Sequence, residues 1–149
     1  MKKLNSGQSL VEMVVAVGMM SLLMVALLSV TSLSIKNTRL AQSRTQAVGL
    51  VQEGVELMRA YRDFNWNGFY AKANGQSYVL LDNWTVETGL TQTGCSQTSY
   101  FDASNFFSRC VKLSTIEAGN VSVEVTVYWQ EGSQLKQVVQ STNLSLWEI

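Results

Sequence analysis

An uncharged apolar segment near the beginning of the chain constrains the fold more than any other feature. Residues 13–35 contain no Asp, Glu, Lys or Arg and consist mainly of Val, Leu, Met and Ala. A helix that crosses a bilayer needs about 20 apolar residues, whereas the apolar stretch of a secretory signal has roughly 7–15. The segment therefore predicts a single membrane-spanning helix. One carboxylate, Glu12, stands at its entrance, five residues after Gly7.

The segment that follows has the periodicity of an amphipathic helix. Between residues 36 and 62, apolar side chains recur at spacings of three and four, and polar side chains occupy mostly the other positions. The chain contains no proline that would end the helix, and Gly49 and Gly54 weaken it by about 1 kcal/mol each relative to Ala. We therefore predict one helix from about residue 9 to about residue 62, with a narrow apolar stripe that packs on the rest of the protein. The predicted stripe consists of Ala41, Val48, Val51, Val55 and Met58.

The remaining residues, 63–149, have the composition of a small β-sheet head. All four Trp and all five Phe lie after Asp63, and these 87 residues are enough for a small core. The clearest strand is 121–129, where apolar and polar residues alternate. Turn residues 130–133 lead into a second strand at 135–147, and weaker patterns predict a strand at 107–114 and an interrupted strand at 78–81 and 84–86. The prediction is an α+β fold in which a long N-terminal helix packs on a small antiparallel sheet. Within the second strand, one side is formed by Val138, Leu144 and Leu146; residues 65–76 and 88–105 are predicted loops.

Composition argues against several classes of function. The chain has no His, which removes the usual general base and the usual neutral metal ligand. Residues 63–149 carry four basic and eight acidic residues, and such an acidic domain offers no basic surface for nucleic acid. Asp82, Glu87 and Asp102 lie in predicted loops without the spacing of a calcium-binding loop, so we expect them to be solvated charges. We predict no enzymatic activity, no cofactor and no metal site.

The N-terminal motif resembles a known processing site. The run Gly7-Gln8-Ser9-Leu10-Val11-Glu12, preceded by Lys2-Lys3 and followed by the apolar segment, is similar to the processing site of type IV prepilins and pseudopilins. Residues 10–17 most resemble the corresponding residues of the minor pilins and minor pseudopilins. A long helix followed by an antiparallel sheet also agrees with the layout of that superfamily.

The resemblance implies a defined set of partners and domains. A membrane aspartyl prepilin peptidase would cut between Gly7 and Gln8 and methylate the new amine of Gln8. An inner-membrane assembly platform and an ATPase would then drive the subunit, together with other pilin subunits, into a helical filament. The implied domains are a cleaved leader at 1–7, a transmembrane or filament-core half-helix at 8–35, an amphipathic half-helix at 36–62 and a globular head at 63–149.

The physics of the motif agrees with these roles. Gly7 has no side chain, so a peptidase can approach its carbonyl closely. A carboxylate inside a membrane costs about 2.5–3.5 kcal/mol on insertion scales, and Glu12 would recover part of this cost by pairing with a cation. Cleavage would supply one as the amine of Gln8 on a neighbouring subunit. Such a head-to-tail contact propagates as an open filament.

Two groups in the head leave alternatives open. In an oxidising compartment, Cys95 and Cys110 would form a disulfide, which would close a loop of about 16 residues and stabilise the fold by about 3 kcal/mol. The alternative is that they remain two free buried thiols. We predict the disulfide, because the resemblance places the head outside the cytoplasm. Trp66, Phe69 and Tyr70 could form an adhesive surface, but the head needs them for its core, and we predict core positions.

Localisation follows from the resemblance rather than from charge. Including the amino terminus, three positive groups precede the apolar segment and three follow it, so the positive-inside rule gives no orientation. We expect a single-pass protein of the cytoplasmic membrane that later enters an extracellular or periplasmic filament. Two alternatives stay open: a minor pseudopilin of a type II secretion or DNA-uptake system, and a single-span anchored binding module that never polymerises.

Overall fold

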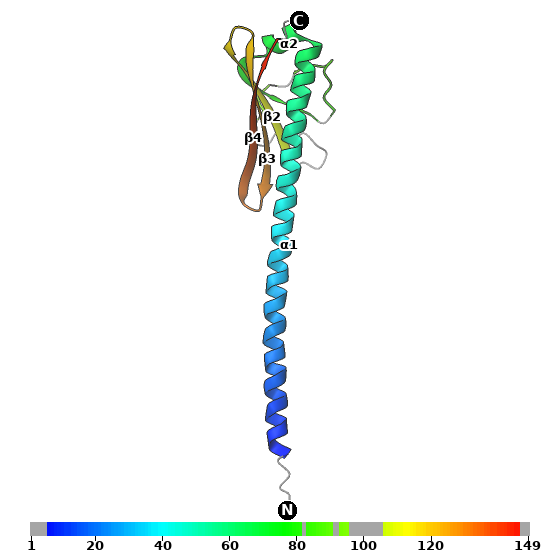
Figure 1. Cartoon of the computed structure of the whole chain (residues 1–149), viewed down its shortest axis with the longest axis vertical. Helices are drawn as coiled ribbons and strands as arrows, with labels where there is room; N and C mark the ends of the chain where they lie inside the picture. The colour runs from blue at the N-terminus through cyan, green and yellow to red at the C-terminus, as the bar shows by residue number, and fades with distance from the viewer. Residues whose placement is uncertain (1–5, 82, 91–92, 96–105, 147–149) are drawn as a thin grey trace, which may run out of the picture. The chain divides into compact units, whose positions relative to one another are not determined.

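The computed structural model has an α+β fold with one long helix and one four-stranded antiparallel sheet (Figure 1). It describes residues 6–81, 83–90, 93–95 and 106–146, with side chains from residue 10 onward. The chain divides into two compact units, Met1–Ala41 and Gln42–Ile149. The predicted fold class is therefore confirmed. The elements are α1 (Ser6–Phe64), α2 (Trp66–Ala71), β1 (Asn74–Val79), β2 (Phe107–Glu117), β3 (Asn120–Glu131) and β4 (Gln134–Ser145).

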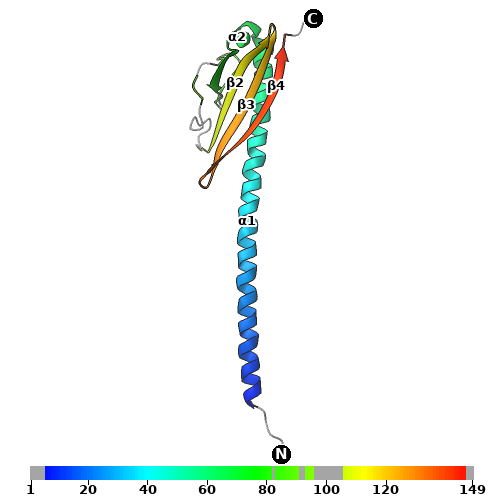
Figure 2. The same cartoon turned by 90° about the vertical axis from the view of Figure 1, so that its left-hand side faces the viewer.

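The predicted long helix α1 is confirmed, and its second half buries an apolar stripe in the core of the head. Figure 2 shows this half of α1 behind the sheet. The predicted stripe is only partly right. Val51, Val55 and Met58 are buried, whereas Ala41 and Val48 are exposed. The true stripe follows spacings of three and four through Ala47, Val51, Gly54, Met58 and Tyr61, all of them buried. Val48 is one position away from Ala47, which turns it by about 100° out of the interface.

The sheet has the strand order β1-β2-β3-β4, and every neighbouring pair is antiparallel. In β3, the strongest predicted strand, every second residue from Val121 to Trp129 is buried in the hydrophobic core, as the alternation predicts. Gly132 and Ser133 form a two-residue turn into β4, and Gly132 has a φ of 62°, which glycine adopts readily. Leu144 is buried as predicted, but Leu146 lies beyond the end of β4 and is exposed. Leu146 therefore does not share the buried side.

The segment between α1 and β2 differs most from the prediction. The predicted loop at 65–76 contains α2, which Asn65 caps by accepting a 2.9 Å hydrogen bond from the backbone N–H of Gly68. Of the predicted interrupted strand, only residues 78 and 79 belong to β1, and residues 84–86 are not in a strand. Trp84 instead donates its indole N–H to the carbonyl of Gly89 at 2.9 Å. Side-chain contacts of this kind determine the local structure, and they cannot be predicted from the alternation of apolar and polar residues.

Cys95 and Cys110 form a disulfide with their Cα atoms 5.6 Å apart, so the prediction of a disulfide is confirmed and that of free thiols is wrong. The disulfide holds residues 93–95 beside β1. There Thr93 forms an isolated bridge with Tyr78, and the backbone N–H of Gly94 donates to the carbonyl of Ser77 at 3.0 Å. Part of one edge of the sheet, at Ser77 and Tyr78, is therefore covered by the chain itself.

Candidate functional site

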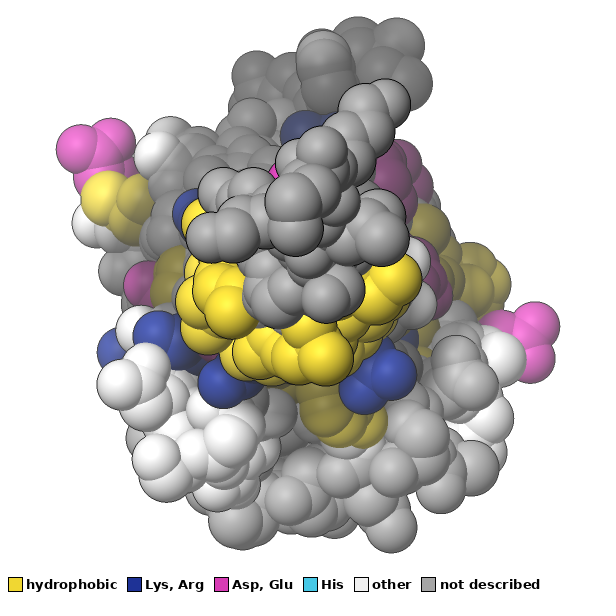
Figure 3. Space-filling view, turned by 90° about the horizontal axis from the view of Figure 1, so that it is seen from below, with side chains coloured by type: hydrophobic (Ala, Val, Ile, Leu, Met, Phe, Trp, Pro, Cys, Tyr) yellow, Lys and Arg dark blue, Asp and Glu magenta, His cyan; other side chains and the backbone are white. Residues whose placement is uncertain are grey.

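The candidate site lies in the first turns of α1. Gly7 and Gln8 are helical, and the side chain of Gln8 lies outside what the structure describes. Glu12 follows Gln8 by one turn and is exposed. From Leu10 to Ile35, every large apolar side chain is exposed, the least being Val15 at 49%. Figure 3 views the molecule from this end and shows hydrophobic side chains, in yellow, gathered around the described part of the helix.

Three hydroxyl side chains within the apolar part of α1 bond to the helix backbone. Ser21, Ser29 and Thr31 donate their hydroxyls to helix carbonyls one turn earlier, at 2.8 to 3.0 Å. Such bonds satisfy a hydroxyl without water or a partner. Glu12 is different, because a carboxylate only accepts hydrogen bonds and carries a full charge. The ion pairs found among the described residues join Arg59 to Glu56, Arg62 to Asp63 and Arg109 to Glu53, and none of them involves Glu12.

By length and composition, α1 qualifies as a membrane span, and it is the single helix of the described residues that does so. None of its most apolar window is buried within the protein. The apolar surface of residues 10–35 therefore needs an apolar environment from outside the chain, either lipid or other helices.

In the head, a fully buried arginine was not recognised as a structural centre from the sequence. Arg109 of β2 is 0% exposed. Its Nε donates to the carbonyl of Leu80 at 3.3 Å, and a terminal nitrogen donates to the carbonyl of Leu81 at 3.5 Å. Another terminal nitrogen lies 3.3 Å from the carboxylate of Glu53 on α1. Arg109 thus connects the sheet, the helix and the chain after β1.

The aromatic residues of the head form a packed cluster. Phe69 is fully buried, with Trp66 and Tyr70 packed partly buried beside it, so the core prediction for these three is confirmed. The ring of Tyr61 makes edge contacts with Phe69 at 5.9 Å and with Trp84 at 5.7 Å between ring centres. Burial raises the pKa of Tyr61 above its usual 10.0, with a smaller rise from Tyr78 and an opposing hydrogen bond at the backbone of Leu90.

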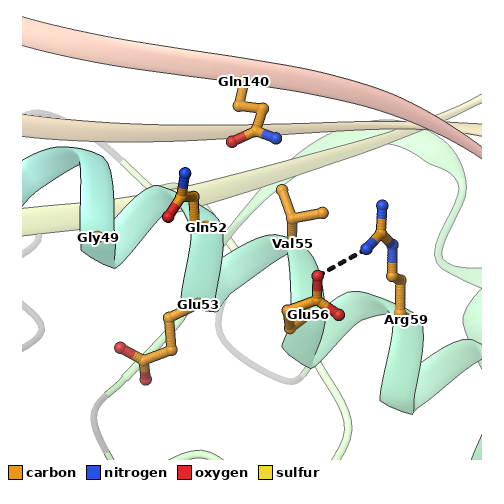
Figure 4. Close-up of a pocket in the computed structure, with 7 residues that line it drawn as sticks. All are labelled: Gly49, Gln52, Glu53, Val55, Glu56, Arg59 and Gln140. Carbon is orange, nitrogen blue, oxygen red and sulfur yellow. Dashed lines mark hydrogen bonds and ion pairs between the residues drawn. The ribbon is translucent and has the colours of Figure 1, made fainter.

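A polar groove of about 490 Å³ runs between α1 and β4. Figure 4 shows Gln140 of β4 facing Gln52 and Val55 of α1, with the Glu56–Arg59 ion pair at one side. No group of three or more His, Cys, Asp or Glu that could hold a metal occurs among the described residues. Glu87 is exposed, while Asp82 and Asp102 lie outside the described residues. The amide and charged side chains that line the groove can form hydrogen bonds.

Comparison of the chain with protein-family models, with curated proteins and with solved structures finds no match. The function must therefore be inferred from the residues of the chain itself.

Proposed function

We propose that this chain is a structural subunit, a minor pilin, of a type IV pilus-like filament. The observation that carries the proposal is Glu12. It is the sole charged residue between positions 4 and 35, it is exposed on an apolar helix, and it follows a glycine that suits a processing peptidase.

In this proposal, the prepilin peptidase cuts between Gly7 and Gln8, and the amine of Gln8 is methylated. The mature chain then begins with a positive charge one helical turn before Glu12. An amine and a carboxylate at this spacing lie on the same side of the helix, so both can face a neighbour. Pairing Glu12 with the amine of an adjacent subunit neutralises both charges in an apolar environment. The same pair fixes how far one helix is displaced along the other.

The apolar surface of α1 and the disulfide support the same proposal. Residues 10–35 expose apolar side chains in all directions, which suits lipid before assembly and packed helices afterwards. Disulfides persist in oxidising compartments and are rare in the cytosol. The Cys95–Cys110 bond therefore favours a head outside the cytoplasm, and the leader would then lie inside it.

Intact mass spectrometry of the protein extracted from cells tests the processing step. We expect the loss of residues 1–7 and one added methyl group on the amine of Gln8. Substitution Gly7→Val should leave an uncut chain that still inserts into the membrane, because its β-branched side chain blocks close approach to the scissile carbonyl. A wild-type chain that retains residues 1–7 in cells with an active peptidase would contradict the proposal and favour a non-polymerising anchor.

A second experiment tests the role of the charge. We expect Glu12→Gln, which keeps the shape and removes the charge, to reduce recovery in sheared filaments by about ten-fold or more. Membrane insertion and the disulfide should stay unchanged. Glu117→Gln, which removes an exposed carboxylate at the end of β2, is the matched control and should assemble normally. Normal assembly of Glu12→Gln would refute the pairing role.

A further inference from the structure

The two edges of the sheet differ in their regularity and in whether another segment of the chain pairs with them. The β1 edge is irregular, with a register shift between Asn74 and Ser77, and residues 93–95 lie along it. The β4 edge has a regular register from Gln134 to Ser145 without a bulge. Proteins usually protect a free edge with a bulge, a proline, a charge or a covering segment. Within the described part of the chain, β4 has no bulge, proline or covering segment, and its one charged side chain, Lys136, lies near the turn and donates to Gln134 at 2.8 Å.

The turn before β4 identifies the backbone groups that face the open edge. In a two-residue hairpin, the residues that flank the turn, here Glu131 and Gln134, exchange hydrogen bonds with each other. Bonded pairs then recur at every second residue, so the even-numbered residues of β4 bond to β3. The odd-numbered residues direct their N–H and C=O groups toward the open edge. These residues are Leu135, Gln137, Val139, Ser141, Asn143 and Ser145, and all of them are exposed and uncharged.

The groove described above lies along the same strand. The even-numbered Gln140 lines it from β4, and Gln52, Glu56 and Arg59 line it from α1. A strand added beside β4 would place alternate side chains over the groove. Amide and charged groups at this position complement polar side chains, whereas the outer face beside Val139 accepts apolar ones.

We infer that the β4 edge binds an extended segment from the head of a different filament subunit, which joins the sheet as a fifth strand. The inference rests on the proposed function, because the filament supplies the neighbouring head. A second copy of this chain is a poorer partner. Its β1 edge is already paired at Ser77 and Tyr78 with its own residues 93–95. Pairing of β4 with β4 uses the same surface on both partners and closes instead of propagating. The bound segment would be extended, with polar side chains toward α1.

Photo-crosslinking from the full chain in filament-producing cells tests this inference. A benzophenone amino acid at Val139, on the open edge of β4, should crosslink to one other filament subunit, identified by mass spectrometry. The matched control position is Lys112, an exposed residue on the same face of the sheet in the interior strand β2. It should give little of that product. A product that contains two copies of this chain, or equal yield from both positions, would overturn the inference.

Substitution at Ser141 tests whether the contact uses the backbone. Ser141→Pro removes an N–H that faces the open edge without removing a bond to β3, and the ring occupies the place of an added strand. Ser141→Thr keeps the N–H and is the matched control. We expect proline to lower the crosslink yield from Val139 about ten-fold and threonine to leave it unchanged, with the disulfide intact in both. Equal yields from both variants would overturn the inference.

The failure of this inference can be distinguished from the failure of the proposed function. A processed chain that enters filaments normally but gives no β4 crosslink contradicts the fifth strand alone. An unprocessed chain that never enters filaments contradicts the proposed function, and with it the identity of the partner proposed here.

Discussion

Two glycines on the second half of α1 provide a sharp test of how the helix packs on the sheet. A Cβ built on Gly54 would lie 2.8 Å from Cγ1 of Val125 on β3, with Arg109 and Leu80 next nearest at 3.5 and 3.6 Å. A Cβ built on Gly49 meets no atom within 4 Å. The same substitution to alanine therefore adds a methyl group to open space at one position and to a close contact at the other.

The expected energies follow from two terms. Replacing glycine by alanine in a helix gains about 1 kcal/mol at either position, so this term cancels when the two variants are compared. At Gly54, the new methyl group must displace Val125, whose β-branched side chain has little rotamer freedom. Overpacking of a core typically costs about 1–3 kcal/mol. Gly49→Ala should thus stabilise the head by up to about 1 kcal/mol, and Gly54→Ala should be about 1–3 kcal/mol less stable than Gly49→Ala.

Unfolding of the full chain in detergent micelles, followed by tryptophan fluorescence, measures this difference. All four Trp lie after Asp63, so the signal reports on the head. For a domain of this size, 1 kcal/mol corresponds to about 4–8 °C in Tm. Val125→Ala removes the contacted methyl group, so Gly54→Ala made in that background should no longer carry the overpacking cost. If Gly54→Ala stabilises the wild-type head as much as Gly49→Ala does, the close packing of α1 on β3 at this point is wrong.

Two further predictions concern buried polar groups of the head. Glu53→Gln should lower the free energy of unfolding, measured by urea titration, by about 1–2 kcal/mol, because it removes the negative charge of the 3.3 Å ion pair with the buried Arg109. Glu56→Gln, which breaks an exposed pair with Arg59, should change the same free energy by less than about 0.5 kcal/mol. Burial raises the pKa of Tyr61 above 10.0, so this tyrosine ionises in the unfolded chain before it does in the folded one as the pH rises. The Tm should therefore fall above about pH 10, and it should fall less in Tyr61→Phe. An equal fall of Tm in both proteins would contradict the raised pKa of Tyr61.

The elements that the sequence predicted correctly are those whose signal is local and long. The uninterrupted helical pattern of α1 and the alternation along β3 each extend over many residues, so single exceptions do not change the prediction. The six residues of α2 carry no such pattern, and they include Gly68. Their helix depends on the cap from Asn65 and on the burial of Phe69, neither of which a short sequence window reveals. The end of β1 depends similarly on Arg109, which lies 29 residues from Leu80 in the chain.

For the candidate site, the residues could be predicted from the sequence, but their binding partners are not part of this chain. The sequence places Gly7, Gln8 and Glu12 in order, and the structure adds that Glu12 is exposed on a helix. Neither contains the proposed partners of these residues, because a peptidase and an adjacent amine both come from other molecules. The open edge of β4 is the opposite case. Its hydrogen-bonding groups belong to the backbone, so residue types alone could not have identified it, and only the register and the turn length do so.

The apolar and polar surfaces of the chain would have separate tasks in the proposed filament. Burial of residues 10–35 is favourable in lipid or against any apolar helix, because the hydrophobic effect has no direction. It can hold a subunit in place, but it cannot select a neighbour or fix its position. The carboxylate of Glu12 and the odd-numbered N–H groups of β4 are directional, and each is satisfied at one relative position of the two partners. Specific assembly should therefore be more sensitive to Glu12→Gln or Ser141→Pro than to exchange of one apolar side chain for another within residues 13–35.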